Sequence, residues 1–521
     1  MKRQPESSPH FSNATTIHTY ALAALALVAI SSRCGFAADA FQELLNRIPR
    51  SANAVVLLNL EKAKQSRLGL KEDWKGKIQN AFAAGAARVP PQAARFVMAS
   101  QIDFEFMEPL WEAAVMDLDE AIPLGPLAKA RGGTLDTIEG LPALSLPNDT
   151  YLVQFGPKTL GAMAPGNRQA VVRWIREVRK PSPPPLSRYL QKAAVYSDKT
   201  GSEIIMALDL DGVMSFERVA KYLKSHQKEL DAWQAKDTFP NNLNQVAEVL
   251  SNVEGIRIGV RVGEQQSSKM AVDLHTDASL LAPFAKPLLL QALSDKGALI
   301  EDFQSWTVDT KGSEISLAGI LSASGRRRLL SLVNSPVSES SLAKAPRVSP
   351  GEVPAIEAKK SREYFRAVVG MANDLKEDMR NAKNLASTHL FFDKYAKRIE
   401  RMPILGVDEE LLKYSAFVAN TLRQATGSVK TMGIQSAARQ SQVTGGDVYA
   451  GDYGGYRYGA YGAYGQPAQM AEIKGVGQER RAIRAEEKGI MATDVQKLRQ
   501  NLIAATTDIR RKMTQKYQIE F

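Results

Sequence analysis

The stretch GSEIIMALDLDGV (Gly201–Val213) indicates how the whole chain is organised. Its apolar run, Ile204–Leu210, is short and rich in aliphatic residues, which is typical of a buried strand. An earlier stretch, SANAVVLLNLEKA (Ser51–Ala63), superposes on it residue for residue. Two matching strands in one chain predict an internal duplication.

Two aspartates end the later strand. Asp209 and Asp211, with Gly212 after them, resemble the strand-end Asp-x-Asp-Gly motif of the haloacid dehalogenase phosphotransferases. That chemistry needs a carboxylate nucleophile with a second carboxylate beside it. The earlier copy has Asn59 and Glu61 at the same positions, and an amide cannot be the nucleophile. We therefore interpret the shared pattern as architecture and expect no catalytic, metal-binding or cofactor-binding residue.

The duplication predicts an α+β fold of two tandem repeats, residues 41–180 and 201–335. Strands follow one another through short turns in both, so we expect antiparallel sheets with helices on one face. A Pro-rich linker at 181–200 separates the repeats, and a Pro/Ser linker at 336–358 follows the second. Besides the first strands, two further landmarks recur: Ser100–Ile102 with Ser251–Val253, and Leu124–Lys129 with Leu281–Lys286.

The C-terminal third, residues 359–521, is predicted to be an all-α, coiled-coil-like module. Its last helix carries an apolar stripe that is expected to face the interior of a helix bundle, with an oligomer seam as the alternative. The members of this stripe are Val495, Leu498, Leu502, Ala505, Ile509 and Met513. An earlier helix shows the same spacing at Phe365, Val368, Ala372, Leu375 and Met379.

A low-complexity tract, GGDVYAGDYGGYRYGAYGAYG, occupies residues 445–465. Alternating glycine and tyrosine cannot form a core, so we expect a disordered or extended loop. It can serve as a flexible tether between helices or as an aromatic contact surface for sugars or a partner chain.

The N-terminus is predicted to be a signal peptide spanning residues 1–40. Lys2 and Arg3 precede the apolar segment Tyr20–Ile30, and Ala38–Ala40 offers the small residues of a cleavage site. The segment is too short to span a bilayer comfortably as a mature helix, and no other stretch is long and apolar enough. We expect export to the periplasm or cell envelope, and whether the segment is cleaved or retained as an anchor stays open.

The composition argues against metal and thiol sites. The single cysteine, Cys34, lies inside the predicted signal peptide, so cleavage removes any disulfide or thiol nucleophile. His226, His275 and His389 lie far apart without metal-binding spacing, and we expect them at surface or helix-face positions.

The positive charge is concentrated in the C-terminal third. The whole chain carries a net charge of +11, and residues 359–521 contain 27 Lys/Arg against 18 Asp/Glu, a difference of +9. For an exported protein, this favours a protein partner, anionic envelope polymers or lipid headgroups over nucleic acid. A solvated basic helix surface without a dedicated partner is the simpler alternative.

The overall layout resembles that of uncharacterised exported proteins of planctomycete-type bacteria. The signal segment, SANAVVLLNLEKA and RMPILGVDEELLKYSAFVANTLRQA (Arg401–Ala425) carry this resemblance. It implies an envelope location and no particular activity. We therefore expect a non-enzymatic binding or scaffolding protein. The alternatives are an exported Mg²⁺-dependent phosphatase or hydrolase centred on Asp209 and Asp211, and a binding protein for an apolar or anionic ligand.

Overall fold

The computed structural model describes residues 41–83, 89–104, 107–180, 186–227, 230, 233, 243–262, 267–332, 353–402, 404, 406–442 and 470–521. The predicted signal peptide, 1–40, and the Gly/Tyr tract, 445–465, lie outside the described residues.

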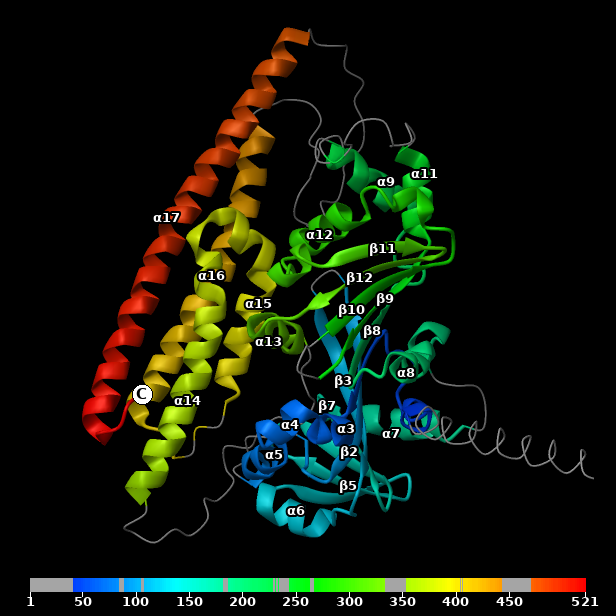
Figure 1. Ribbon diagram of the computed structural model, residues 1–521, viewed down its shortest axis with the longest axis vertical. Coiled ribbons are helices and arrows are strands. Elements are labelled where there is room, and N and C mark those ends of the chain that lie inside the picture. Colours follow the sequence, from blue (N-terminus) through cyan, green and yellow to red (C-terminus); the bar gives the residue numbers. More distant parts are fainter. Residues whose placement is uncertain are drawn as a thin grey trace, which may run out of the picture.

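One large antiparallel sheet forms the centre of the described N-terminal two thirds (Figure 1). In the described part of the chain it has twelve strands, in the order β11-β12-β10-β9-β8-β1-β2-β3-β7-β6-β5-β4. The first seven are β1 (Ala54–Asn59), β2 (Ala93–Asp103), β3 (Glu108–Leu118), β4 (Thr134–Ile138), β5 (Leu141–Leu146), β6 (Thr150–Gly156) and β7 (Thr159–Ala164). The others are β8 (Ile204–Asp209), β9 (Val253–Val260), β10 (Ser267–Leu274), β11 (Thr307–Lys311) and β12 (Glu314–Ile320).

The two strands singled out in the sequence, β1 and β8, pair with each other at the middle of this sheet. Their register places Ala54 opposite Leu208 and Leu58 opposite Ile204. Because this pairing joins the two halves, the strands form one continuous sheet, where the sequence predicted a sheet for each repeat. The α+β class and the antiparallel arrangement are confirmed.

Of the other two landmarks, one falls at different places in the two halves. Ser100–Ile102 lies near the end of β2, whereas Ser251–Val253 spans the end of α11 (Leu243–Ser251) and the first residue of β9. The remaining landmark falls in both halves on a segment that opens a helix. Its first copy begins α6 (Leu124–Arg131), and its second runs into α12 (Ala285–Asp295).

Both faces of the first half of the sheet are covered, so the prediction of helices on one face is wrong there. Val55 and Leu57 of β1 pack in one cluster with Trp174 of α7 (Arg168–Val178). Val56 points the other way, into a separate cluster with Leu124 of α6. The physical reason is the unbroken apolar run of β1, which buries side chains on both faces of the sheet.

The remaining helices of the sheet region connect and cover these strands. Residues 41–45 are also helical. The others are α3 (Leu60–Gln65), α4 (Arg67–Lys71), α5 (Trp74–Ala83), α8 (Arg188–Thr200), α9 (Phe216–Ser225), η1 (Ser279–Leu281), η2 (Glu301–Gln304) and α13 (Ala323–Ser331).

The C-terminal helical region is confirmed and packs as a bundle beside the sheet (Figure 1). Its elements are α14 (Val353–Lys376), η3 (Asp378–Arg380), α15 (Ala382–Glu400), α16 (Glu409–Gln442) and α17 (Met470–Tyr517). The α17 stripe faces the interior: Val495, Leu502, Ile509 and Met513 are buried in the chain's own core. In the described chain, the stripe is therefore an intramolecular face.

The bundle and the second half of the sheet share one hydrophobic core. Met270 and Val272 of β10 belong to the same cluster as Phe365 of α14 and Leu422 of α16. The helical region and the sheet therefore pack against each other. The sequence analysis had treated them as separate regions joined by a linker at 336–358. Within the described residues, no helix has the length and hydrophobicity needed to cross a membrane.

Helices occupy parts of both expected linkers. Residues 188–200 of the first form α8, which buries Leu190, Ala193 and Ala194 against the sheet. An apolar face at helical spacing therefore outweighs the preceding prolines. In the second, α14 begins at Val353, before the expected end of the linker.

Candidate functional site

The aspartates of the strand-end motif lie at the end of β8, between two antiparallel neighbours, β1 and β9. The Asp209 side chain accepts a hydrogen bond from the backbone N–H of Asp211 (3.0 Å). Asp211 Oδ1 lies 3.1 Å from His275 Nε2, and both of these side chains are exposed. Asp209 therefore stabilises its own turn, and the surrounding strands lack the parallel arrangement expected of a phosphotransferase nucleophile.

The described residues contain no group of three or more His, Cys, Asp and Glu side chains that could hold a metal ion. His226 lies 3.4 Å from Asp295, at the end of α9. His389 lies on a face of α15, half-buried, and burial lowers its pKa. The three histidines each contact a different part of the fold: His226 contacts Asp295, His275 contacts Asp211 and His389 contacts the backbone of Ala386.

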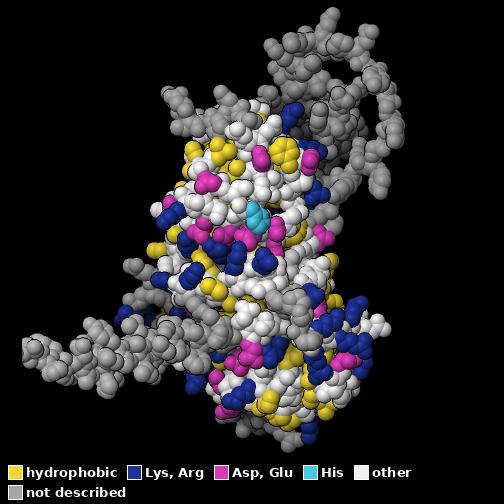
Figure 2. Space-filling view, turned by 90° about the vertical axis from the view of Figure 1, so that its right-hand side faces the viewer, with side chains coloured by type: hydrophobic (Ala, Val, Ile, Leu, Met, Phe, Trp, Pro, Cys, Tyr) yellow, Lys and Arg dark blue, Asp and Glu magenta, His cyan; other side chains and the backbone are white. Residues whose placement is uncertain are grey.

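A network of charged side chains lies on the face of the second half-sheet that α8 partly covers. Arg257 Nη1 is 2.7 Å from Asp273 Oδ2 and also contacts Glu314. Lys269 Nζ lies 2.8 Å from Glu314, and Tyr189 of α8 donates a hydrogen bond to Asp273 (2.8 Å). Figure 2 shows acidic and basic side chains intermixed across this side of the molecule. Burial raises the pKa of Asp273 although Arg257 opposes the shift.

Each carboxylate of this network therefore already has a cationic or hydroxyl partner. Such a mutually satisfied set holds three strands and a helix together. We regard this set as structural.

Two further ionic contacts fasten the sheet to the bundle. Arg328 of α13 lies 2.8 Å from Asp378 of η3, and both side chains are buried. Burial raises the pKa of Asp378 to about 6, with Arg328 opposing the shift. At the turn end of the β2–β3 hairpin, Glu108 lies 2.7 Å from Lys397 of α15.

A third cluster closes the bundle itself. Asp408 precedes α16 and accepts a hydrogen bond from the backbone N–H of Glu410 (2.8 Å). Lys516 Nζ lies 2.6 Å from Asp408 Oδ2, and Tyr517 donates to the same oxygen (2.8 Å). Burial alone would raise the pKa of Asp408, but these hydrogen bonds hold it below the usual value. The end of α17 is thereby fixed to the start of α16.

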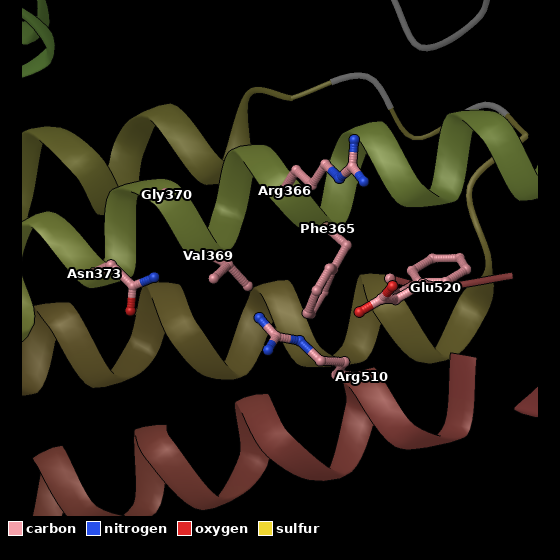
Figure 3. A pocket seen from close by; sticks show the side chains of 8 residues that line it. Phe365, Arg366, Val369, Gly370, Asn373, Arg510 and Glu520 are labelled. Carbon is pink, nitrogen blue, oxygen red and sulfur yellow. The ribbon is translucent and has the colours of Figure 1, made fainter. Parts of the chain in front are cut away.

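A groove lies between α14 and the C-terminal end of the chain, and we call it the α14–α17 groove (Figure 3). Its volume is about 440 Å³. The lining side chains come from α14, from α17 and from the residues after α17: Phe365, Arg366, Val369, Gly370, Asn373, Arg510, Glu520 and Phe521.

The floor of the groove is formed by aromatic and aliphatic side chains that are already packed against one another. Phe365 and Val369 are one helical turn apart on α14, and both are buried together with Phe521. The Phe521 ring meets Phe365 edge-on at 6.0 Å and stacks on Tyr517 at 5.8 Å. The C-terminal segment is thus anchored by its aromatic rings, and it forms one end of the groove.

Basic side chains stand above this floor. The Arg510 guanidinium lies 5.7 Å from the Phe365 ring centre, a cation–π distance. In Figure 3, Arg510 extends from α17 toward Phe365 and Val369, while Arg366 points outward from α14. Among the described residues, neither arginine has a carboxylate within 4.0 Å, although Glu520 also lines the groove.

The sequence analysis identified only part of this groove. Phe365 was recognised as a core residue from its helical spacing, but Arg366 and Arg510 were not singled out. They come from helices far apart in the chain, so no local motif links them. The usable signal was the basic excess of the C-terminal third.

Comparisons with known proteins do not assign a family. No protein-family model matches the sequence, and no curated protein matches it. A solved structure of TP0453, crystal form I, is similar at a TM-score of 0.33 and 13% identity, covering 56% of this chain and 95% of that one. Crystal form III of TP0453 gives a TM-score of 0.32 and 9% identity, with coverage of 56% and 97%. Similarity at this level defines neither fold nor function for this chain.

Proposed function

We propose that this chain is an exported, non-enzymatic binding protein of the periplasm or cell envelope, whose helical bundle binds an anionic partner. The single observation that carries the proposal is the pair of arginines beside the α14–α17 groove, Arg366 and Arg510, which have no carboxylate partner among the described residues. Unpaired guanidiniums are well suited to carboxylate and phosphate groups.

The charge distribution supports the same proposal. Residues 359–521 carry 27 Lys/Arg against 18 Asp/Glu, so the bundle attracts anions over a distance as well as at the groove. The N-terminal segment supports export, and an exported protein meets anionic lipids and polymers in the envelope.

We also propose that the sheet region is an internal duplication that serves as a rigid framework. Two backbone hydrogen bonds at the ends of the central pair support this idea. Asn59 N–H donates to Glu203 O, and Asp209 N–H donates to Asn53 O, both at 2.8 Å. In the alignment of the two copies, Asn59 corresponds to Asp209 and Asn53 corresponds to Glu203. Exchanging the two copies therefore converts one hydrogen bond into the other, as expected for two copies related by a two-fold axis.

Sedimentation with isolated envelopes tests the binding proposal. Purified residues 41–521 are mixed with envelope membranes and centrifuged, and the bound fraction is measured at low and high salt. The double variant Arg366→Glu/Arg510→Glu should lose most of its binding. The control Arg173→Glu/Lys224→Glu makes the same charge change at exposed positions on α7 and α9 and should bind normally.

Equal binding by the two double variants would refute the role of the bundle. A salt-insensitive interaction would refute an electrostatic partner, because exposed charges are screened at high ionic strength. Deleting residues 359–521 is a poorer test, since the deletion would uncover the core shared with the sheet.

A further inference from the structure

We propose that the open edge of β11 pairs with β11 of a second copy of this chain, in an antiparallel register centred on Thr310. The described sheet has β11 at one end and β4 at the other (Figure 1). A sheet edge carries backbone N–H and C=O groups with no strand beside them, and such an edge can pair with another chain. In this sheet the β4 edge is closed by side chains, and the β11 edge is open.

The hairpin turn determines which residues of β11 face the open edge. Residues 312–313 join β11 to β12 in a two-residue turn. The residues that flank such a turn form a hydrogen-bonded pair, and hydrogen bonding then alternates along the strand. Alternate residues of β11 therefore bond to β12: Thr307, Asp309 and Lys311. Val308 and Thr310 direct their backbone N–H and C=O groups away from the sheet, where no described residue bonds to them.

The β4 edge has the same geometry but is closed. Its two-residue turn, 139–140, directs the backbone of Thr137 outward, at the position that matches Thr310. The Thr137 N–H donates to Asp136 Oδ1 (2.7 Å), and the Thr137 carbonyl oxygen accepts from Arg168 Nη2 (3.2 Å). Both strands begin with Thr-x-Asp-Thr, so the arginine of α7 makes the difference between the two edges.

The side chains of β11 leave its edge accessible and carry two opposite charges. Val308 keeps 38% of its surface exposed, and Asp309 and Lys311 are exposed as well. Asp309 and Lys311 lie on the same face of β11, because they are two residues apart. Neither has an ion-pair partner within 4.0 Å among the described residues. Glu314, which faces Lys311 across the turn, already contacts Arg257 and Lys269.

The order of these charges favours a second copy as the partner. Outward-facing backbone groups of two antiparallel copies meet when the two-fold axis passes through Val308, Asp309 or Thr310. An axis at Asp309 places this carboxylate opposite its own copy, and an axis at Val308 places it opposite Thr307. An axis at Thr310 places Asp309 opposite Lys311 twice. Opposite charges across two strands stabilise the pair, and like charges destabilise it.

The pairing is expected to be weak and to place both helical bundles on the same side. It joins short strands through few hydrogen bonds, as in transient interfaces. Its two-fold axis stands perpendicular to the sheet, so equivalent faces stay together. Each bundle packs on the face of β10 that carries Met270 and Val272. If the bundle binds an envelope surface as proposed above, a dimer can hold that surface at two points. The dimer itself does not depend on that function.

Sedimentation velocity of purified residues 41–521 tests the pairing. The wild type should shift from monomer to dimer as its concentration rises toward about 1 mM. Thr310→Pro removes the outward N–H, which β12 does not use, and should leave a folded monomer. Leu135→Pro is the matched control at the outward position of β4, and it should dimerise as the wild type does. A wild type that stays monomeric, or a Thr310→Pro variant that dimerises normally, would overturn the proposal.

Charge reversal tests the register without removing a backbone group. Asp309→Lys and Lys311→Asp each place like charges opposite each other, so each variant alone should need about tenfold more protein to dimerise. An equimolar mixture of the two variants restores opposite charges at both positions and should dimerise as readily as the wild type. A mixture that dimerises no better than either variant alone would overturn the register centred on Thr310.

Discussion

Val56 and Met206 lie directly opposite each other across the β1/β8 pair, and their positions differ by 150 residues. A shift of 150 residues also turns Ala54 into Ile204 and Leu58 into Leu208, and Ala54 faces Leu208 while Leu58 faces Ile204. The pairing therefore maps onto itself when the two strands are exchanged. The Val56–Met206 pair marks the centre of that exchange, at the middle of the twelve-stranded sheet.

The Asp209 side chain should be replaceable by an amide. Asn59 already accepts a hydrogen bond from the backbone N–H of Lys62 (2.9 Å) at the matching position in the first strand. Asp209→Asn keeps the acceptor oxygen, so we expect the free energy of unfolding to change by less than about 0.5 kcal/mol. Urea denaturation measures this change.

The same variant tests the enzymatic alternative. Wild-type protein and Asp209→Asn are assayed with a chromogenic phosphate ester and Mg²⁺. We expect no turnover that depends on Asp209. A Mg²⁺-dependent activity present in the wild type and lost in the variant would contradict a non-enzymatic function.

The buried Asp378 should make stability depend on pH. Its pKa is raised from 3.8 to about 6 in the folded chain, so between these values the folded state holds a proton that the unfolded state has lost. The stabilisation that Asp378 contributes is therefore fully present below its pKa in the unfolded state, and it is lost as pH rises through about 6. The full effect is roughly 3 kcal/mol.

Other carboxylates with lowered pKa values, including Asp408, act in the opposite direction. The informative quantity is thus the difference between wild type and Asp378→Asn from pH 4 to pH 7, measured by urea denaturation. The destabilisation caused by the variant should be larger at pH 4 than at pH 7. A difference that does not change with pH would contradict the raised pKa.

Asp408 should contribute more to stability than its exposed partner. Asp408→Ala removes a helix N-cap and leaves the Tyr517 hydroxyl without this acceptor, so we expect a loss of about 2 kcal/mol. Lys516→Ala removes only the exposed member of the ion pair and should cost less than about 1 kcal/mol. Chemical denaturation compares the two variants, and equal losses would show that the ion pair itself dominates.

Removing the bundle should destabilise the sheet. Residues 41–332 alone would expose the apolar face of β10 that packs in the same core as Phe365 and Leu422. We expect low soluble yield and strong binding of a hydrophobic dye by this truncated chain. A soluble fragment with an unchanged unfolding midpoint would show instead that the two regions fold independently.

Local sequence patterns predicted the elements better than their assembly. The apolar run of β1 and the α17 stripe were recognisable because burial imposes a spacing on side chains. The run Val55–Val56–Leu57 also carried the signal for a sheet covered on both faces, since a one-sided antiparallel strand alternates. That signal was outweighed by the order of strands and turns.

Local patterns could not predict two features of the structure, the pairing of β1 with β8 and the α14–α17 groove. The sequence of a strand does not specify which strand it pairs with, because the hydrogen bonds between strands join backbone groups that every residue has. Arg510 meets Phe365 only because α14 and α17 pack side by side. Spacing within one helix could not reveal either contact.

Fractionation of the producing cell, with N-terminal sequencing of the recovered chain, tests the central claim most directly. We predict recovery in the periplasmic or envelope fraction with a mature start near Phe41. A chain that still begins at Met1 and is recovered in the cytoplasm would contradict export, and with it the assignment of an anionic envelope partner to the bundle.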